Sequence, residues 1–317
     1  TPAHMRYSSV VSRETVRIAL TMAALNDLEV KASDIQNAYL TAPCAEKIWT
    51  TLGSEFGPDA GKTAIVVRAL YGLASAGAAF SKHLADCMRH MGYTCCRADP
   101  DLWFKADVYT NGSKYYRYVI LYVDDCLCIG CNAELELAKL DHYFQMKPGS
   151  IGDPDIYLGN KMKQVTLDND VIAWALSSSK YVQEAIKNVE AYLASKDGME
   201  LGKKLKPKTK TTWPTGYEPE LDTSDELDLN GIRYYQHLIG VLQWIVELGR
   251  VDICLEVSMM SSHLALPRQG HLLALFHIFA YLKKYHNAEL VFDPTVPEID
   301  EAEFERSDWT STEFGHV

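Results

Sequence analysis

The chain has 317 residues and a mass of 35.6 kDa, and its 47% hydrophobic and 23% charged residues are typical of an ordinary globular protein with two or three compact units. The sequence contains no run of 18 or more apolar residues, so it does not predict a membrane-spanning helix. The net charge of −11 argues against a uniformly basic nucleic-acid-binding surface, but twelve acidic residues lie in two segments without a basic residue, 218–228 and 293–305, so the remainder is near neutral and can hold a local basic groove.

The first predicted helix covers residues 12–25. Ser12 is a capping residue ahead of the first turn, and Val16, Leu20 and Ala23 recur at helical spacing. The elements predicted after this helix are a strand at 28–35, a helical turn at 37–40, short strands at 48–52 and 64–70, and a long helix within 70–93.

Two apolar strands at 115–122 and 126–130 are predicted to form a hairpin, and the turn between them carries Asp124 and Asp125. The elements predicted around this hairpin are a strand at 100–107, an amphipathic helix at 133–147, strands at 157–167 and 170–176, and a helix at 179–196.

A polar stretch at 200–228, which contains proline and lysine, is predicted to be a linker. Its basic run at 201–210 is most simply interpreted as a solvated loop. Strongly apolar helices are predicted at 230–249 and 271–285, so the C-terminal half should be mainly helical and the first half mixed.

The eight cysteines, at positions 44, 87, 95, 96, 126, 128, 131 and 254, do not form matched C-x-x-C pairs, and several lie in apolar runs. We therefore expect reduced, small buried thiols and not disulfides or a zinc site. The first ten residues lack the features of a signal peptide, and the sequence does not open with an initiating methionine. We therefore expect the chain to be a piece of a longer protein.

Asp124 and Asp125 would be unremarkable in a solvent-facing turn. Apolar strands on both sides would partly desolvate them, however, and repulsion would then raise the pKa of one carboxyl unless a cation neutralised the pair. Asp34, at the end of the strand predicted at 28–35, is the candidate for a third carboxylate, which only the fold can bring near. Such a site could hold two Mg²⁺ ions for phosphoryl transfer.

The ordered motifs DIQNAYL (34–40), LYGL (70–73) and YVDD (122–125) resemble those of the reverse transcriptase of copia-type LTR retrotransposons. The resemblance continues through FQMK, YLGNKM and the segment 234–253, so it covers nearly the whole chain. It implies an α+β right-hand polymerase fold, with a palm that holds an antiparallel sheet, partial fingers, and a helical thumb with the start of a connection.

The domain organisation expected from the resemblance and the composition has four parts. These are a palm with partial fingers at 1–199, a polar linker at 200–228, a helical thumb and connection at 229–285, and an acidic tail at 286–317 leading to an RNase H domain beyond the chain. Residues 307–310, SDWT, are interpreted as a chance similarity to an RNase H motif.

The resemblance implies an RNA-directed DNA polymerase, a nucleotidyltransferase that adds dNMPs to a primer 3′ end with two Mg²⁺ ions, Mn²⁺ being the alternative. Its catalytic, metal-binding residues are then Asp34, Asp124 and Asp125. The residues it assigns to nucleotide binding are Tyr39, Ser75 and Lys147, with the carbonyl of Ile35 as a further ligand, and those it assigns to the primer are Tyr122, Val123 and Gly159. Core packing for Tyr39 and an ordinary exposed position for Lys147 are the simpler alternatives.

The expected partners are an RNA or DNA template with its primer, dNTPs, and other Pol segments such as integrase and RNase H, without a membrane. The expected location is cytoplasmic, in a virus-like particle, with the nucleus as the alternative. Candidate phosphate contacts in the C-terminal helices are Arg233, Arg250, Arg268, Lys283 and Lys284.

The sequence departs from the family pattern after LYGL, where the family has K-Q-S-P-R-A-W and this chain has A-S-A-G-A-A-F. Loss of the polar and cationic side chains predicts weaker dNTP binding with an intact carboxylate set. The rival interpretation is a truncated or catalytically impaired relic that acts at most as a nucleic-acid or polyprotein binding module. A third interpretation is a metal-dependent nuclease. It is less favoured, because the sequence supplies no general base near the carboxylates.

Overall fold

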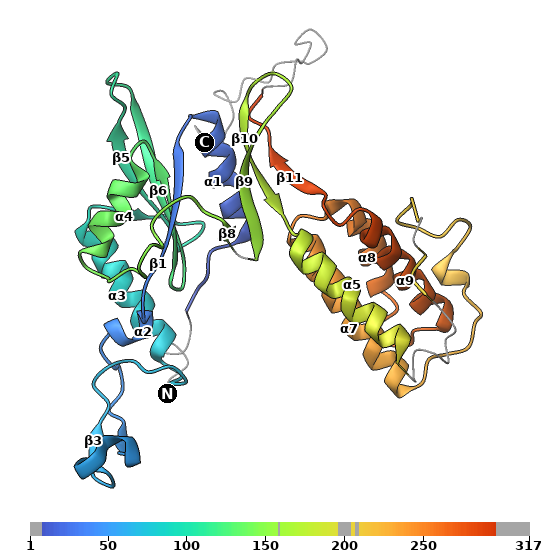
Figure 1. Cartoon of the computed structure of the whole chain (residues 1–317), viewed down its shortest axis with the longest axis horizontal. Helices are drawn as coiled ribbons and strands as arrows, with labels where there is room; N and C mark the ends of the chain where they lie inside the picture. Colours follow the sequence, from blue (N-terminus) through green and yellow to red (C-terminus); the bar gives the residue numbers. More distant parts are fainter. Residues whose placement is uncertain (1–7, 158, 196–203, 207–208, 296–317) are drawn as a thin grey trace, which may run out of the picture.

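The chain folds into a sheet unit and a helical unit, with a second, smaller sheet on the side of the sheet unit that faces the helices (Figure 1). This computed structural model describes residues 8–157, 159–195, 204–206 and 209–295. Within these ranges, none of the helices has the length and apolar character needed to cross a bilayer. The arrangement confirms a mixed fold with antiparallel sheets.

The main sheet is antiparallel throughout, in the order β1-β7-β6-β5-β4. Its strands are β1 (Glu29–Asp34), β4 (Thr94–Cys95), β5 (Leu102–Val108), β6 (Lys114–Tyr122) and β7 (Asp125–Gly130). Every residue of β7 after Asp125 is buried, because helices cover both faces of the sheet at this strand. The hairpin predicted from the two apolar strands is therefore confirmed.

Helices cover the two faces of this sheet: α1 (Arg13–Leu25) lies on one face, and α3 (Ala76–His90) and α4 (Ala133–Asp141) lie on the other. Side chains alternate along β7, so Leu127 and Ile129 belong to the core under α1, whereas Cys126 and Cys128 belong to the core under α3 and α4. The predicted cap of α1 is confirmed, since the Ser12 hydroxyl accepts a hydrogen bond from the backbone N–H three residues later.

A β-hairpin projects from the sheet unit at the lower left of Figure 1. It consists of β2 (Trp49–Thr51) and β3 (Thr63–Ile65), with the 3₁₀ segment η2 (Ser54–Asp59) between them, and the short helix α2 (Ala38–Thr41) leads into it. Trp49 and Phe56 are exposed on this hairpin, and neither it nor η2 contains a fully buried side chain. The two short strands were predicted, although β3 ends before residue 70.

The second sheet has the order β11-β10-β9-β8 and packs on α1. Its strands are β8 (Ile156–Tyr157), β9 (Asn160–Thr166), β10 (Ile172–Ser177) and β11 (Glu289–Phe292). Trp174, Leu176 and Phe292 share the core under α1 with Leu20. Through this sheet the C-terminal part of the described chain returns to the sheet unit.

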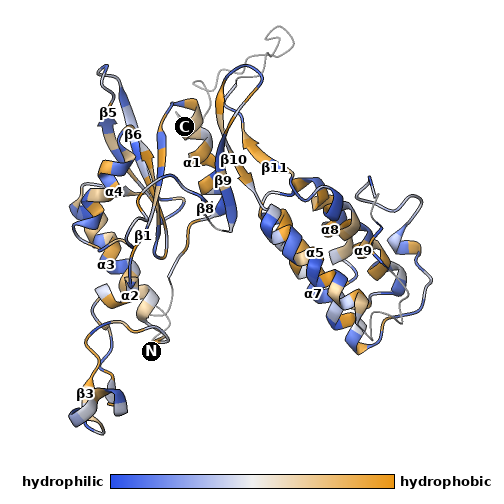
Figure 2. Cartoon of the chain, in the orientation of Figure 1, coloured by the Kyte–Doolittle hydropathy of each residue, from blue (hydrophilic) through white to orange (hydrophobic). Residues whose placement is uncertain are grey.

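The helical unit contains α5 (Ser179–Ala194), α7 (Leu229–Glu247), α8 (Cys254–Ser261) and α9 (Gln269–Lys284), with the 3₁₀ turns η3 (Pro219–Leu221) and η4 (Val251–Ile253). These helices share one apolar core, in which Val182, Leu242 and Phe279 are fully buried. Figure 2 shows the corresponding division of α5 and α7 into a hydrophilic and a hydrophobic side.

Three predicted domain limits need correction. Helix α5, predicted within the palm, packs with α7 and α9, because the residues of its apolar stripe are buried in the core of the helical unit. The predicted linker is packed in its described part, since Leu205 and Pro219 are buried there. The predicted acidic tail begins with a strand, because Glu289–Phe292 pairs with β10 and buries Phe292. Residues 296–317, with the SDWT motif, lie outside the described residues.

Candidate active site

The turn between β6 and β7 consists of Val123 and Asp124, and the strands on either side pair at Tyr122 and Asp125. Val123 has a φ of 56°, in the left-handed region that β-branched residues rarely adopt. The buried strands on both sides hold this conformation. Strained backbone of this kind is often found at functional sites, and nothing in the sequence indicated it.

Asp34, the last residue of β1, lies directly opposite Asp125, the first residue of β7. The N–H of Ile35 donates to the carbonyl of Asp124 at 2.8 Å, so Asp34 and Asp125 form a non-hydrogen-bonded pair, in which side chains are closest and Cα atoms lie about 4.5 Å apart. The carbonyl of Ile35 lies on the same side of the extended backbone as its N–H. Like charges placed directly opposite each other destabilise a sheet.

The pKa of Asp125 shows the effect of this arrangement. Burial, then the negative charges of Asp124 and Asp34, raise the pKa of the Asp125 carboxyl to about 6, and Lys147 opposes this rise. The charged form of Asp125 is therefore less stable than that of an ordinary exposed aspartate, and a cation beside it would favour that form.

Lys147 supplies one cation at this place. Its ammonium lies 2.5 Å from Oδ2 of Asp34, and its backbone N–H donates to the carbonyl of the same residue at 2.8 Å. This hydrogen bond to Asp34 is the largest cause of a raised pKa for Lys147. The other carboxylate oxygen of Asp34, Oδ1, is buried and has no hydrogen-bond partner among the described residues.

The acidic cluster is not a closed metal cage. In the described ranges no three His, Cys, Asp or Glu side chains are grouped tightly enough to hold an ion by themselves. The donors nevertheless suit a hard cation, because carboxylate and carbonyl oxygens are the ligands that Mg²⁺ prefers and this ion usually completes its shell with water and substrate phosphates. The buried, unpartnered Oδ1 of Asp34 and the raised pKa of Asp125 fit such an ion.

Tyr39 and Ser75, predicted to bind nucleotide, lie in the region between α2 and the start of α3. The ring of Tyr39 lies 4.7 Å from that of Tyr71 and 6.0 Å from that of Phe80, and it is only partly buried. Ser75 precedes α3, is buried, and makes no side-chain capping bond. Tyr39 thus takes part in core packing and also keeps an exposed surface, whereas the side chain of Ser75 is covered.

The residues predicted at the primer lie on two neighbouring hairpins. Tyr122 pairs with Asp125, so both side chains are on the α1 face of the sheet, where Asp34 also lies. Gly159 has a φ of 80° in the turn between β8 and β9. In the same turn region Tyr157 is buried, and its hydroxyl has no partner among the described residues. The sequence does not mark Tyr157 as functional, because a tyrosine in a short strand is an ordinary core residue.

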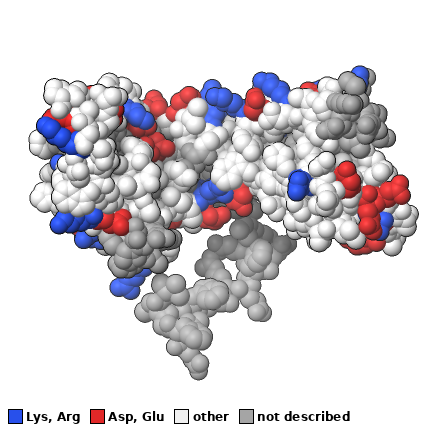
Figure 3. Space-filling view, turned by 90° about the horizontal axis from the view of Figure 1, so that it is seen from below, with Lys and Arg blue, Asp and Glu red and all other residues white. Residues whose placement is uncertain are grey.

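The predicted phosphate contacts in the helical unit are partly wrong. Arg250 is 2% exposed and forms an ion pair with Asp252, so it cannot reach a phosphate on the surface. Arg268 and Lys283 pair with carboxylates as well. Figure 3 shows acidic side chains at the far end of the helical unit, where the acidic segment 218–228 runs.

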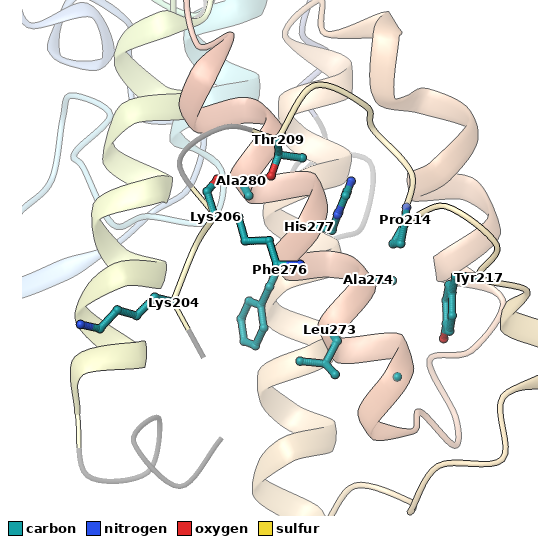
Figure 4. A pocket seen from close by; sticks show the side chains of 11 residues that line it. Lys204, Lys206, Thr209, Pro214, Tyr217, Leu273, Ala274, Phe276, His277 and Ala280 are labelled. Atoms are coloured by element: carbon teal, nitrogen blue, oxygen red, sulfur yellow. Dashed lines mark hydrogen bonds between the residues drawn. The ribbon is translucent and has the colours of Figure 1, made fainter. Parts of the chain in front are cut away.

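A cavity of about 270 Å³ lies in the helical unit between α9 and the segment that precedes α7 (Figure 4). The side chain of Lys206 points toward Phe276 on its wall, whereas that of Lys204 points away. His277 is engaged with the backbone carbonyl of Thr211. The cavity does not include any of the carboxylates at the β6–β7 turn, so it is separate from the candidate site.

Comparisons with known proteins show which family the chain belongs to. The family model described as "Reverse transcriptase (RNA-dependent DNA polymerase)" matches residues 4–197, more than half of the chain. A retrovirus-related Pol polyprotein from transposon TNT 1-94 of Nicotiana tabacum is 28% identical over 284 residues, 87% of this chain and 20% of the polyprotein. The Pol polyprotein from transposon RE1 of Arabidopsis thaliana is 26% identical over 87% of this chain and 17% of its own length.

A shorter relative, the putative transposon Ty5-1 protein of Saccharomyces cerevisiae, is 26% identical over 78% of this chain and 74% of its own length. The chain spans about a fifth of the tobacco polyprotein that it matches. The residues matched by the family model, 4–197, include the three aspartates. From the family match and the ordered motifs around these aspartates, we conclude that the chain belongs to the reverse transcriptase family and is the reverse transcriptase region of a copia-type LTR retrotransposon Pol polyprotein.

Proposed function

We propose that this chain is the polymerase part of a Pol polyprotein and adds dNMPs to a primer 3′ end on an RNA or DNA template. The observation that carries the proposal is the placement of Asp34 opposite Asp125, whose chain neighbour is Asp124, in a half-buried acidic cluster at the ends of β1 and β7. A structural turn would not need a second carboxylate across the sheet, where repulsion is unfavourable.

Two Mg²⁺ ions, with Mn²⁺ as the alternative, would be held by Asp34, Asp124, Asp125 and the carbonyl of Ile35. When bound, such ions stabilise the charge that develops on the transferring phosphoryl group and polarise its oxygens. The ammonium of Lys147 now neutralises Asp34. It would be free to contact the triphosphate once another cation took its place on that carboxylate.

The remaining predicted residues have roles that follow from their positions. Tyr39, partly exposed beside Tyr71, would lie under the nucleotide sugar and discriminate against a 2′-hydroxyl. Tyr122 and Val123 at the turn, and Gly159 on the neighbouring hairpin, would line the primer end. In this proposal the sheet unit is the palm, the projecting hairpin is part of the fingers, and the helical unit is the thumb of a right-hand polymerase.

The proposal extends to partners and location. A template with its primer and dNTPs are the substrates, and integrase and RNase H segments of the same polyprotein are the expected neighbours. The proposed place of action is a cytoplasmic virus-like particle, with the nucleus as the alternative.

A catalytically impaired relic is the second candidate, and the A-S-A-G-A-A-F segment favours it. Ala74 is exposed and Ala78 is half-buried at positions where the family carries cations. Without those charges the triphosphate would lose favourable contacts, although the aspartates would remain. The relic would bind template and primer without extending it.

Primer extension by the chain in its polyprotein context distinguishes the two candidates. We expect extension with Mg²⁺ on a primed RNA or DNA template, and its loss by a factor of about 10³ or more in Asp124→Asn, which keeps the side-chain size and removes the charge. Extension that is equal in wild type and Asp124→Asn would refute the assignment of the site. Template binding without extension in the wild type would favour the relic.

A further inference from the structure

Two arginines of the sheet unit hold the C-terminal end of α7 in the helical unit. The guanidinium of Arg13 lies 2.5 Å from a carboxylate oxygen of Glu247, and its central carbon lies 4.3 Å from the ring centre of Trp244. Arg17, one turn further along α1, donates to the backbone carbonyl of Glu247 at 2.8 Å. All these partners lie in the last turn of α7.

The electrostatics of α7 explain why the contact is favourable. The C-terminal end of a helix carries a partial negative charge that a cation stabilises, yet α7 has no basic residue in its last turn. Glu247 adds a full negative charge at this end. Arg13 and Arg17 therefore supply, from a different unit, the positive charge that α7 itself lacks.

The same end of α7 also meets the β8–β9 hairpin. A Cβ atom at Gly159 would lie 3.9 Å from the side chain of Leu248, so the turn of the hairpin and the end of α7 are in close contact. A cavity of about 20 Å³, with room for one water molecule, lies where the three elements meet. Its lining includes Arg13, Arg17, Tyr157, Asn160 and Glu247. We call this meeting point of α1, the β8–β9 turn and the end of α7 the joint.

The joint is linked to the acidic cluster through Tyr157. This buried tyrosine belongs to the core that also contains Tyr122, and the charge of Asp125 is among the causes that raise its pKa after burial and Cys126. The β8–β9 hairpin thus approaches the end of α7 at Gly159 and shares a core with Tyr122 through Tyr157. Figure 1 shows this hairpin and α1 on the side of the sheet unit that faces the helical unit.

We propose that Arg13 and Arg17 are positioning residues, which fix the helical unit and the β8–β9 hairpin relative to the three aspartates. The consequence for catalysis rests on the proposed polymerase function, because a duplex held between the two units must present its primer end at the carboxylates. The structural part of the proposal stands without that function. Breaking the joint should loosen the grip on primer and template more than it slows the chemical step.

Hydrogen exchange measured by mass spectrometry on the purified chain tests the structural part. Arg13→Glu should raise the exchange of the segments 159–162 and 244–249 about fivefold, the change expected when an ion pair with its ring contact is lost. The double variant Arg13→Glu/Glu247→Arg should restore slow exchange, because the charges are exchanged and not removed. Lys187→Glu is the matched control, since it makes the same charge change in an exposed pair on α5.

Unchanged exchange in Arg13→Glu, an equal rise in Lys187→Glu, or no restoration by the double variant would each overturn the proposal. Slow exchange in α9 shows that the fold is intact. If Arg13→Glu does not fold, Glu247→Gln, which keeps the size of the side chain, must give a smaller rise in the same segments, and no rise would overturn the proposal.

Primer extension supplies the functional readout. In Arg13→Glu we expect the KM for primer–template to rise about fivefold or more, with kcat changed by less than about twofold. A fall in kcat with an unchanged KM would contradict the positioning role. A wild-type chain that extends no primer would refute the proposed function, and the exchange experiment would still decide whether the joint exists.

Discussion

Asp34 and Asp125 face each other across a non-hydrogen-bonded pair of the sheet, and only one oxygen of Asp34 is neutralised, by Lys147. Such an arrangement lowers the stability of the folded chain when no metal is present. It persists because the neighbouring parts of β1 and β7 are deeply buried and fix the backbone. Substitutions of single residues can distinguish the stability lost to repulsion among these carboxylates from the stability that the surrounding strands provide.

The pH dependence of stability should report the crowding at Asp125. Its folded pKa of about 6 lies above the ordinary value of 3.8, so the folded state holds the proton more tightly and loses stability as the pH rises from about 4 to about 6. Asp125→Asn lacks the ionisable carboxyl, so it does not lose stability in this way. Its free energy of unfolding relative to that of wild type should therefore increase by on the order of 1 kcal/mol as the pH rises from about 4 to about 6. Urea unfolding at pH 4 and pH 7 with a chelator measures it.

Asp168→Asn, in an exposed turn, is the control for this experiment. Its stability relative to wild type should stay constant over the same pH range. Parallel pH profiles for Asp125→Asn and wild type would show that the carboxylates are not crowded as described.

Val123→Gly tests the strain at the turn. Glycine adopts a φ of 56° without the steric cost of a β-branched side chain, so the free energy of unfolding should rise by about 1 kcal/mol. Val108→Gly is the control, because the same change at an exposed strand position without a positive φ should lower it by a similar amount. A decrease of equal size in both variants, measured by chemical denaturation, would contradict a strained turn.

At the scale of elements, periodicity and capping predicted the long helices and the hairpin that carries Asp124 and Asp125. They could not predict β11, because four residues are too few to show a strand pattern and their pairing with the distant β10 has no local signal. The grouping of α5 was also out of reach, since an amphipathic stripe does not say which neighbour covers it.

Phe292→Ala tests whether β11 belongs to the fold. Phe292 is buried against Trp174 and Leu20, so its truncation should lower the free energy of unfolding by about 3 kcal/mol. Val291→Ala is the matched control, because Val291 is 39% exposed on the neighbouring position of the same strand and should cost less than about 1 kcal/mol. Equal and small decreases in the free energy of unfolding of both variants, measured by urea denaturation, would contradict a structural role for β11.

At the scale of the whole molecule, the three aspartates were predicted by the order of their motifs, and the fold places two of them opposite each other from positions 91 residues apart in the chain. The ion pair between Lys147 and Asp34, 113 residues apart, could not be predicted, because side-chain contacts between distant segments have no local signature. For the same reason the sequence could not predict the contact of Arg13 with Glu247.

Metal binding at these aspartates is the most direct test of the account. Mn²⁺ binding can be followed by the loss of the free-ion electron paramagnetic resonance signal, with primer–template and a dNTP present. We expect wild type and the exposed-turn variant Asp168→Asn to bind Mn²⁺ equally, and Asp34→Asn and Asp125→Asn to bind it at least about tenfold more weakly. Equal binding by all four proteins would contradict a metal site at the ends of β1 and β7.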